Sequence, residues 1–443
     1  MLPCPTSRKH LQLIWSEPDR LSLLTAKAAG YSWRHQTEST CSQNGREPRA
    51  VNIASPVVAR RRARPRLTKD CSQVFSMARR AYNFSAGPAM LPTEVLEVAA
   101  SQMLSYRGIG VGPMEISHRS AHFSEIIECA RETLRDLLNV PQSHDILFMQ
   151  GGGIAQNSIV PLNLMSLADR SRPEADFIVS GTWSEKTEQE AMKYGRTNRA
   201  VHLDGRAPLS QLNITASTFS KSASYLHVCS NETIEGVEIL DLDPIAKYNS
   251  SPIVVDASSN ILSAPVDFTH VAALYAGAQK NIGPAGVTVV IVRRDLLGHA
   301  HPYCPSAFDW RLVSEHGSMY NTPPTYGIYI AGLVFEWIRD QGGVSAMHAN
   351  SEVKSSLIYD CIDKSSLYYN HIDKSYRSRL NVPFHFHDRS LEELFLEKAR
   401  DIDLVYLKGH KKVGGIRASL YNAMPLEGVA TLVDFMKEFE RKA

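Results

Sequence analysis

The 443-residue chain is long enough for two domains and a sizeable core, and its 43% hydrophobic and 21% charged residues are typical of a globular protein. No apolar run approaches the roughly 20 residues that a membrane-spanning helix needs, which excludes that class of protein. The seven cysteines include no Cys-x-x-Cys pair, so a disulfide framework and a zinc finger are also excluded and a reducing compartment is favoured.

The net charge of +2 hides an uneven distribution along the chain. Residues 1–76 carry 13 Lys and Arg against 5 Asp and Glu, whereas residues 77–443 carry 35 against 41. The first segment lacks sustained periodicity and ends near an arginine cluster at 60–66, so we expect a disordered basic extension. Three interpretations stay open: an organellar targeting segment, a nucleic-acid-binding arm, or sequence upstream of a start at Met77.

After an N-terminal arm at 77–92, alternating helices and strands predict a large domain over 93–335. Apolar residues spaced three and four apart indicate helices at 92–104 and 123–140. Continuous rather than alternating apolar runs indicate strands that are buried on both faces, as in a mainly parallel α/β sheet flanked by helices. These runs lie at 145–150, 175–181, 224–230, 251–258, 272–278 and 287–292.

The pattern changes after about residue 325, and we expect a smaller α+β domain at 336–443. A long apolar helix is predicted at 327–341 and a closing amphipathic helix at 428–442. Strand-like segments at 378–387 and 414–422 lie between them. The first of these contains two histidines on one face, His385 and His387, but without an evident third ligand we assign no metal site.

Ligands in an open α/β sheet bind at the carboxyl ends of the strands, and four predicted strand ends carry notable residues. Gly151 to Gly153 precede a helix and are suited to an anion-binding turn, or to a plain tight turn. Asp256 follows a buried run and needs a positive partner or a capping role. Lys280 stands between a strand and a Gly/Pro loop, as a desolvated nucleophile or a solvated lysine. Trp183 is suited to covering a flat ligand, or to the core.

An anion loop, an acid, a lysine and a flat aromatic side chain at one sheet edge together describe a pyridoxal-phosphate site. The lysine can form a Schiff base with the aldehyde, the acid can pair with the pyridinium nitrogen, and the loop can bind the phosphate. The glycine loop lacks the Lys-Ser/Thr of a Walker loop and the spacing of a dinucleotide site, so nucleotide binding is disfavoured.

Long strings in the chain carry a specific likeness to a known family. They are NFSAGPAMLP at 83–92, EISHRS at 115–120, HVCSNETIEGVE at 227–238, YAGAQKNIGPAG at 275–286, GSMYNTPPT at 317–325, RSRLNVPF at 377–384 and GGIRASLYNAMPLEGV at 414–429. With these strings, residues 77–443 resemble the class V aminotransferases of the fold-type I pyridoxal-phosphate enzymes, and among them the phosphoserine aminotransferases.

The resemblance implies a role for each matching residue around the cofactor. Lys280 would bind the cofactor covalently and move the substrate proton, and Asp256 would keep the ring nitrogen protonated. Trp183 would stack on the ring. Thr233 and Gln279 would make polar contacts around the cofactor. Gly153 and the backbone of Ile154 would bind its phosphate, together with Asn321 and Thr322 from a second subunit. The resemblance therefore implies a homodimer with shared sites.

For the substrates, the resemblance implies a set of cations. Arg417 corresponds to the residue that binds the α-carboxylate, since a guanidinium matches a carboxylate bidentately. The pocket for a phosphate or a side-chain carboxylate corresponds to His118, Arg119, His410 and Lys411. The chain departs from the family pattern at Ile154 and Ala155, which removes a possible side-chain contact, and at Lys411, where an amine replaces a guanidinium.

The implied activity is transamination between L-glutamate and 3-phosphohydroxypyruvate, giving O-phospho-L-serine and 2-oxoglutarate, for serine biosynthesis. In bacteria the family also implies 4-phosphohydroxy-L-threonine formation for pyridoxine biosynthesis. Another class V aminotransferase, such as a serine–glyoxylate type, is the alternative enzyme, and a nucleic-acid-binding protein is the alternative outside enzymes. We expect a cytoplasmic enzyme, or an organellar one if residues 1–76 are a transit segment.

Overall fold

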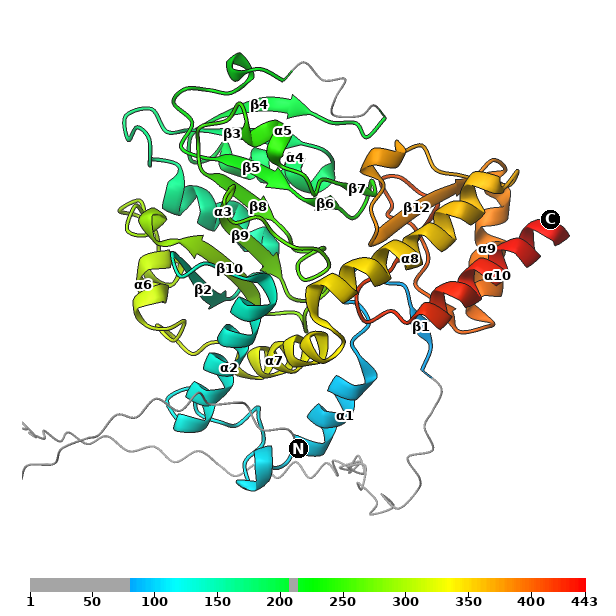
Figure 1. Cartoon of the computed structure of the whole chain (residues 1–443), viewed down its shortest axis with the longest axis horizontal. Helices are drawn as coiled ribbons and strands as arrows, with labels where there is room; N and C mark the ends of the chain where they lie inside the picture. Colours follow the sequence, from blue (N-terminus) through cyan, green and yellow to red (C-terminus); the bar gives the residue numbers. More distant parts are fainter. Residues whose placement is uncertain (1–79, 207–213) are drawn as a thin grey trace, which may run out of the picture. The chain divides into compact units, whose positions relative to one another are not determined.

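The computed structural model describes residues 80–206 and 214–443. The chain divides into two units, residues 1–78 and 79–443, and the described residues all belong to the second unit (Figure 1). The expectations for residues 1–76 therefore lie outside the described residues.

The large sheet has seven strands in the order β2-β10-β9-β8-β5-β3-β4. Six of them run in one direction, and β10 alone is antiparallel to both of its neighbours. This confirms the expected α/β class with a mainly parallel sheet. The strands are β2 (His144–Met149), β3 (Glu174–Val179), β4 (Arg196–His202), β5 (Leu226–Cys229), β8 (Ile253–Asp256), β9 (Val271–Gly277) and β10 (Thr288–Arg293).

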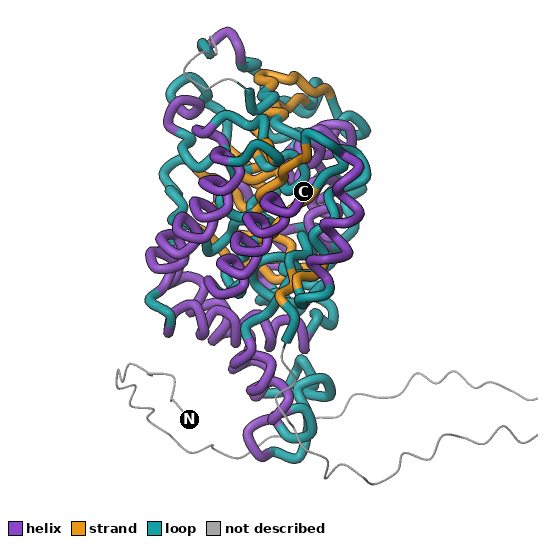
Figure 2. Tube along the Cα trace, turned by 90° about the vertical axis from the view of Figure 1, so that its right-hand side faces the viewer, coloured by secondary structure: helices purple, strands orange, loops and turns teal. Residues whose placement is uncertain are grey.

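Helices cover both faces of this sheet, which explains the continuous apolar runs. Ile146 and Phe148 of β2 pack into a core with helices α2 and α7, whereas Leu147 and Met149 pack into a second core with helices α3 and α6. The tube in Figure 2 shows strands lying between helical segments. The helices of this part are α1 (Thr93–Gln102), α2 (Ala121–Leu138), α3 (Gly152–Leu164), α4 (Thr182–Ala191), α5 (Asp243–Ala246), α6 (Trp310–Glu315) and α7 (Thr325–Asp340).

The C-terminal residues build a core of their own around a three-stranded antiparallel sheet, β11-β12-β14. Its strands are β11 (Tyr368–Tyr369), β12 (Asn381–Phe386) and β14 (Ile416–Ser419), and its helices are α8 (Gly343–Lys364), α9 (Glu392–Arg400) and α10 (Leu426–Lys442). The predicted strands at 378–387 and 414–422 and the closing helix are thus present. The division of the domains after residue 335 stays a prediction.

The N-terminal arm joins this C-terminal core. Strand β1 (Tyr82–Asn83) pairs in parallel with β13 (Leu404–Val405), and the neighbouring Phe84 is fully buried in the C-terminal cluster. None of the helices that the structure describes is both long enough and apolar enough to cross a membrane.

Candidate active site

The carboxyl ends of the central strands meet at one edge of the large sheet. Asp256 is the last residue of β8, Lys280 follows the end of β9, and Trp183 lies in the first turn of α4 after β3. Their side chains reach one cavity of about 500 Å3, which includes open solvent at its mouth. Six residues expected from the sequence line it: Gly153, Ile154, Trp183, Asp256, Gln279 and Lys280.

Lys280 lies next to the flat face of the tryptophan. Its Nζ is 5.3 Å from the centroid of the Trp183 ring. The surrounding protein withdraws water from the amine and lowers the pKa of Lys280, while the Asp256 carboxylate acts in the opposite direction. A lowered pKa increases the share of neutral amine, which is the form that attacks carbonyl carbons.

Asp256 is fixed in orientation at the end of its strand. The backbone N–H of Ser258 donates to Asp256 Oδ1 at 2.9 Å. The buried Tyr275 faces this carboxylate, and desolvation followed by the charge of Asp256 raises the pKa of the phenol, so Tyr275 stays a hydrogen-bond donor. His227, 3.0 Å from the Tyr275 hydroxyl, has its pKa lowered to about 4 by burial and is neutral.

The glycine loop forms the N-terminus of α3. Gly151 and Gly152 have φ angles of 96° and 67°, which glycine adopts without steric cost. A Cβ on Gly153 would lie 3.0 Å from Ser258 Oγ, so a side chain there would narrow the cavity. The first N–H groups of a helix lack intrahelical acceptors and can bind an anion. Together with the lysine, the acid and the indole, this loop fits pyridoxal phosphate.

Thr233 and Arg417 connect the cavity to the C-terminal sheet. The indole Nε1–H of Trp183 donates to Thr233 Oγ1 at 2.8 Å, and the Thr233 carbonyl accepts a hydrogen bond of 3.2 Å from Arg417. Burial lowers the pKa of Arg417, but the ordinary arginine pKa of 12.5 is more than five units above neutrality, so the guanidinium remains charged. Desolvation, and then Arg417, also lower the pKa of the nearby His410.

His118 and Arg119 lie elsewhere in the chain, in the segment immediately before α2. Arg119 is exposed and His118 is half-buried. Among residues 80–206 and 214–443, no hydrogen bond or ion pair joins either of them to the residues around Lys280. The structure of one chain therefore does not bring them together with Arg417. Lys411 is exposed beside His410.

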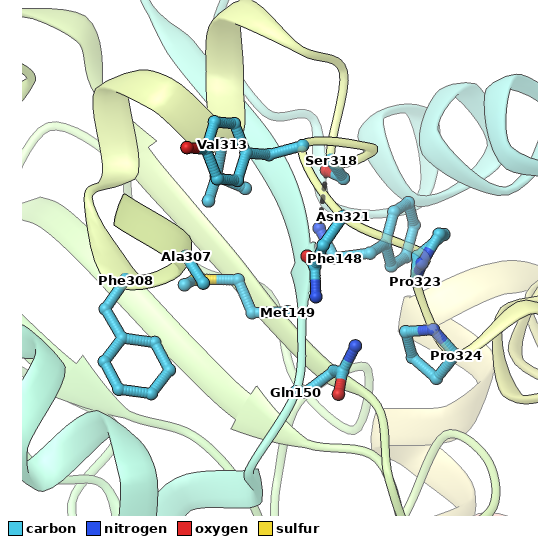
Figure 3. Close-up of a pocket in the computed structure, with 11 residues that line it drawn as sticks. Phe148, Met149, Gln150, Ala307, Phe308, Val313, Ser318, Asn321, Pro323 and Pro324 are labelled. Carbon is cyan, nitrogen blue, oxygen red and sulfur yellow. Dashed lines mark hydrogen bonds between the residues drawn. The ribbon is translucent and has the colours of Figure 1, made fainter. Parts of the chain in front are cut away.

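Asn321 and Thr322 are exposed on the segment before α7, and Asn321 lines another cavity. Figure 3 shows Asn321 next to Gln150, and Gln150 Nε2 donates to the Thr322 carbonyl at 3.0 Å. Gln150 immediately precedes the glycine loop, so the two segments are linked. They nevertheless stand outside the cavity that Lys280 lines.

Several residues at the site escaped the sequence argument. Ser258 lines the cavity and also accepts a hydrogen bond of 3.1 Å from the Gly277 N–H. Gly87 of the N-terminal arm touches the lysine, because a Cβ there would lie 3.2 Å from Lys280 Cγ. Lys412 reaches from the C-terminal part to α4, where its Nζ donates to Thr182 Oγ1 at 2.9 Å. Only the family strings offered a signal for Gly87, and no local pattern marks Ser258 or Lys412.

Comparison with known proteins agrees with the family that the sequence resembles. The model of the class V aminotransferases matches residues 81–432. The phosphoserine aminotransferase of Ralstonia nicotianae is 57% identical over 364 residues, which cover 82% of this chain and 96% of that protein.

Solved structures agree with this match. The phosphoserine aminotransferase from Bacillus circulans subsp. alkalophilus has a TM-score of 0.76 at 38% identity, over 82% of this chain and 99% of that one. The pyridoxal-phosphate-bound phosphoserine aminotransferase from Trichomonas vaginalis has a TM-score of 0.74 at 38% identity, over 81% and 100%. The chain therefore belongs to the class V aminotransferases, and within them to the phosphoserine aminotransferase family.

Proposed function

We propose that this enzyme transfers the amino group between L-glutamate and 3-phosphohydroxypyruvate with pyridoxal phosphate as cofactor, giving O-phospho-L-serine and 2-oxoglutarate. The observation that carries the proposal is the placement of Lys280 beside Trp183, with Asp256 and an anion-binding helix N-terminus around the same cavity. When bound, the cofactor supplies an electron sink that stabilises negative charge at the substrate α-carbon.

The residues around the cavity hold the cofactor in a fixed orientation. The N–H groups of Gly153 and Ile154 bind its phosphate, and Asp256, oriented by Ser258, faces its ring nitrogen. Trp183 covers one face of the ring, and Thr233 and Gln279 add polar contacts. Asn321 and Thr322 complete the phosphate site from the second subunit of a homodimer.

Lys280 moves the proton. Because its pKa is lowered by desolvation, a larger fraction of the amine is neutral near pH 7 and accepts the proton from the substrate α-carbon. The ammonium formed in this way would hold the proton at Nζ until it is returned. The indole of Trp183 beside the Nζ excludes water from one side of this path.

The cations of the C-terminal part select the substrates. Arg417, which is held against the Thr233 carbonyl, binds the α-carboxylate. His410 and Lys411 bind the phosphate of one substrate or the side-chain carboxylate of the other. His118 and Arg119 lie away from this cavity in their own chain, and we propose that they complete the anion pocket across the dimer.

Exposed residues support a homodimer. Asn321 and Thr322 are exposed, and the cavity residue Ile154 keeps 59% of its surface accessible. Leu104 and Met114, in the segment before α2, are 86% and 58% exposed. Apolar side chains of this size are typical of surfaces that a second subunit covers.

The cofactor test uses a lysine variant and a matched control. The purified wild type incubated with pyridoxal phosphate is expected to absorb visible light, and Lys280→Ala is expected to lose this absorption. Lys186→Ala is the control. The Nζ of Lys186 is also near the Trp183 ring, 4.8 Å from its centroid, but Lys186 is exposed on α4. A colourless wild type would overturn the proposal.

The substrate test compares kcat/KM for phosphoserine and unphosphorylated serine. The anion pocket should favour phosphoserine by at least about a hundredfold, since its cations are left unpaired by serine. Equal values would instead indicate an aminotransferase for neutral substrates.

The pathway follows from this substrate: we propose serine biosynthesis and, in a bacterium, pyridoxine biosynthesis, in the cytoplasm. Restored growth of a serine-requiring strain would test the first pathway.

A further inference from the structure

Two carboxyl groups bind the first turn of α4, the helix that carries Trp183. Glu232 accepts hydrogen bonds from the backbone N–H groups of Trp183 and Ser184, each at 2.8 Å, and from Ser184 Oγ at 2.6 Å. Glu235 Oε1 accepts from the backbone N–H of Thr182 at 3.1 Å and from its hydroxyl at 2.5 Å. Because the residue before the helix is glycine, these two side chains replace the missing capping side chain.

The two carboxyl groups also lie close together, on the same side of Gly181. A Cβ on Gly181 would lie 2.6 Å from both Glu232 Cδ and Glu235 Oε2. Glu232 is fully buried, and the buried Glu235 Oε2 has no hydrogen-bond partner among the described residues. A fully buried negative charge next to a half-buried one with an unpartnered buried oxygen is unfavourable. A proton on one carboxyl group, donated to the other, removes both costs.

The surrounding charges do not supply this donor. Lys280 and Cys229 lie close enough to Glu232 for its charge to act on them. On the other side, Arg417 and His410 face Glu235, and Lys412 contacts the Thr182 hydroxyl. These groups act on the pair through space, but the described residues place none of them in hydrogen-bond contact with Glu235 Oε2.

We propose that Glu232 and Glu235 are positioning residues that share one proton, and that this proton keeps the first turn of α4, and with it Trp183, in place beside Lys280. The proposal rests on the function proposed above, because Trp183 acts there on the cofactor. Loss of the proton leaves two negative charges under the helix turn. The turn then loosens, and the indole no longer holds the cofactor as tightly.

Electrostatics supports the shared proton. Burial, and then the charge of Glu235, raise the pKa of Glu232 to about 7. The folded protein thus keeps a proton that the unfolded chain releases near the ordinary glutamate pKa of 4.5. The contribution of the pair to stability therefore falls as pH rises between these two values.

Glu235→Gln is the deciding variant. Its amide oxygen can keep both hydrogen bonds from Thr182, and its NH2 group, in place of the unpartnered Oε2, can donate to Glu232 as the proposed shared proton does. The variant is a permanent substitute for the shared proton. Glu190→Gln is the matched control, since Glu190 lies on the same helix and contacts Lys193 and Ser158 at the other end.

Infrared spectra and thermal unfolding midpoints of the holoenzyme, taken from pH 5.5 to 9, test the shared proton directly. The wild type and Glu190→Gln should show a protonated carboxyl band that is lost near pH 7, and a midpoint that falls as pH rises from 5.5 to about 7 and then levels off. Glu235→Gln should lack the band and this fall. Absence of the band in the wild type at pH 6, or the same fall in Glu235→Gln, would overturn the shared proton.

Cofactor binding tests the positioning role. The Kd of the wild type for pyridoxal phosphate, divided by that of Glu235→Gln, should rise about tenfold from pH 6 to pH 8.5, the factor that one pKa unit of coupling produces. A ratio that does not change with pH contradicts the role of the proton in placing Trp183. If the wild type fails to convert phosphoserine, the proposed function fails, but the infrared and unfolding results still decide the shared proton.

Discussion

At the scale of single residues, the indole of Trp183 is oriented by one hydrogen bond, from its Nε1 to Thr233 Oγ1 at 2.8 Å. Thr233→Val keeps the side-chain shape and removes the acceptor, so the indole N–H loses its partner. We expect cofactor affinity to fall by about five- to tenfold, since an unmade hydrogen bond of a half-buried group costs about 1 kcal/mol. Titration of the cofactor-free protein with pyridoxal phosphate measures this change.

Thr233→Ser is the control for this prediction, because it keeps the hydroxyl and should bind the cofactor within about twofold of the wild type. If the valine variant binds as tightly as the threonine protein, the hydrogen bond does not orient the indole.

At the scale of secondary-structure elements, one buried lysine connects α8 to the turn after β14. Lys354 Nζ donates to the carbonyls of Leu420, Tyr421 and Met424 at 3.0, 2.8 and 3.1 Å. Lys354→Met leaves these carbonyls without their donor, and we expect a loss of about 1 to 3 kcal/mol in the free energy of unfolding. Chemical denaturation measures it.

The loss should depend on pH with a defined sign. Burial lowers the pKa of Lys354 from 10.5 to about 7. Between these values the unfolded chain holds more protons than the folded one, so the wild type gains stability with rising pH. The difference in the free energy of unfolding between the wild type and Lys354→Met should therefore widen from pH 7 to pH 9. Lys364→Met, on the exposed side of the same helix, should change stability little at either pH. A gap that is constant with pH would contradict the assignment.

The sequence predicted the interior elements well because burial on both faces leaves a simple pattern. The runs that became β2, β3, β5, β8, β9 and β10 are all continuous and apolar. It missed β4, whose segment RTNRAVH is largely polar and has one buried residue, Val201. Both β4 and β2 are edge strands, but β2 is buried along most of its length and keeps an apolar run, whereas β4 buries too little surface to require one.

The site follows the same logic. Lys280, Asp256 and Trp183 each stand at the end of a recognisable strand, so the topology alone brings them to one edge. Glu232 and Lys412 contact α4 from segments 48 and 230 residues away along the chain, and no local pattern encodes such contacts. No local pattern gave the positions of His118 and Thr322 relative to the cavity, since these depend on how loops fold, and only the family resemblance implied a role for each.

At the scale of the whole molecule, the shared-site proposal makes a prediction about mixed dimers. Lys280→Ala and the double variant Asn321→Ala/Thr322→Ala should each be nearly inactive on their own. After the two are unfolded together and refolded, a mixed dimer has one site with an intact lysine and intact Asn321 and Thr322 from its partner. We expect recovery of about a quarter of the wild-type activity, because half of a random mixture is mixed dimers with one competent site each.

Refolding each variant separately is the control and should give no recovery. Mixing without recovery, while the proteins dimerise, would show that Asn321 and Thr322 serve the site of their own chain. Sedimentation analysis of the same samples establishes the dimer.

The pairing of β1 with β13 has a consequence for the order of folding. The arm at Tyr82–Asn83 leaves the ribosome early, but its partner Leu404–Val405 is made near the end of synthesis. Contacts between segments so far apart in sequence form late, after the entropy of closing the intervening chain has been overcome. Gly87, against Lys280, belongs to that arm. A nascent chain thus completes the surroundings of its lysine only when translation is almost finished, and shortened chains carry an open site.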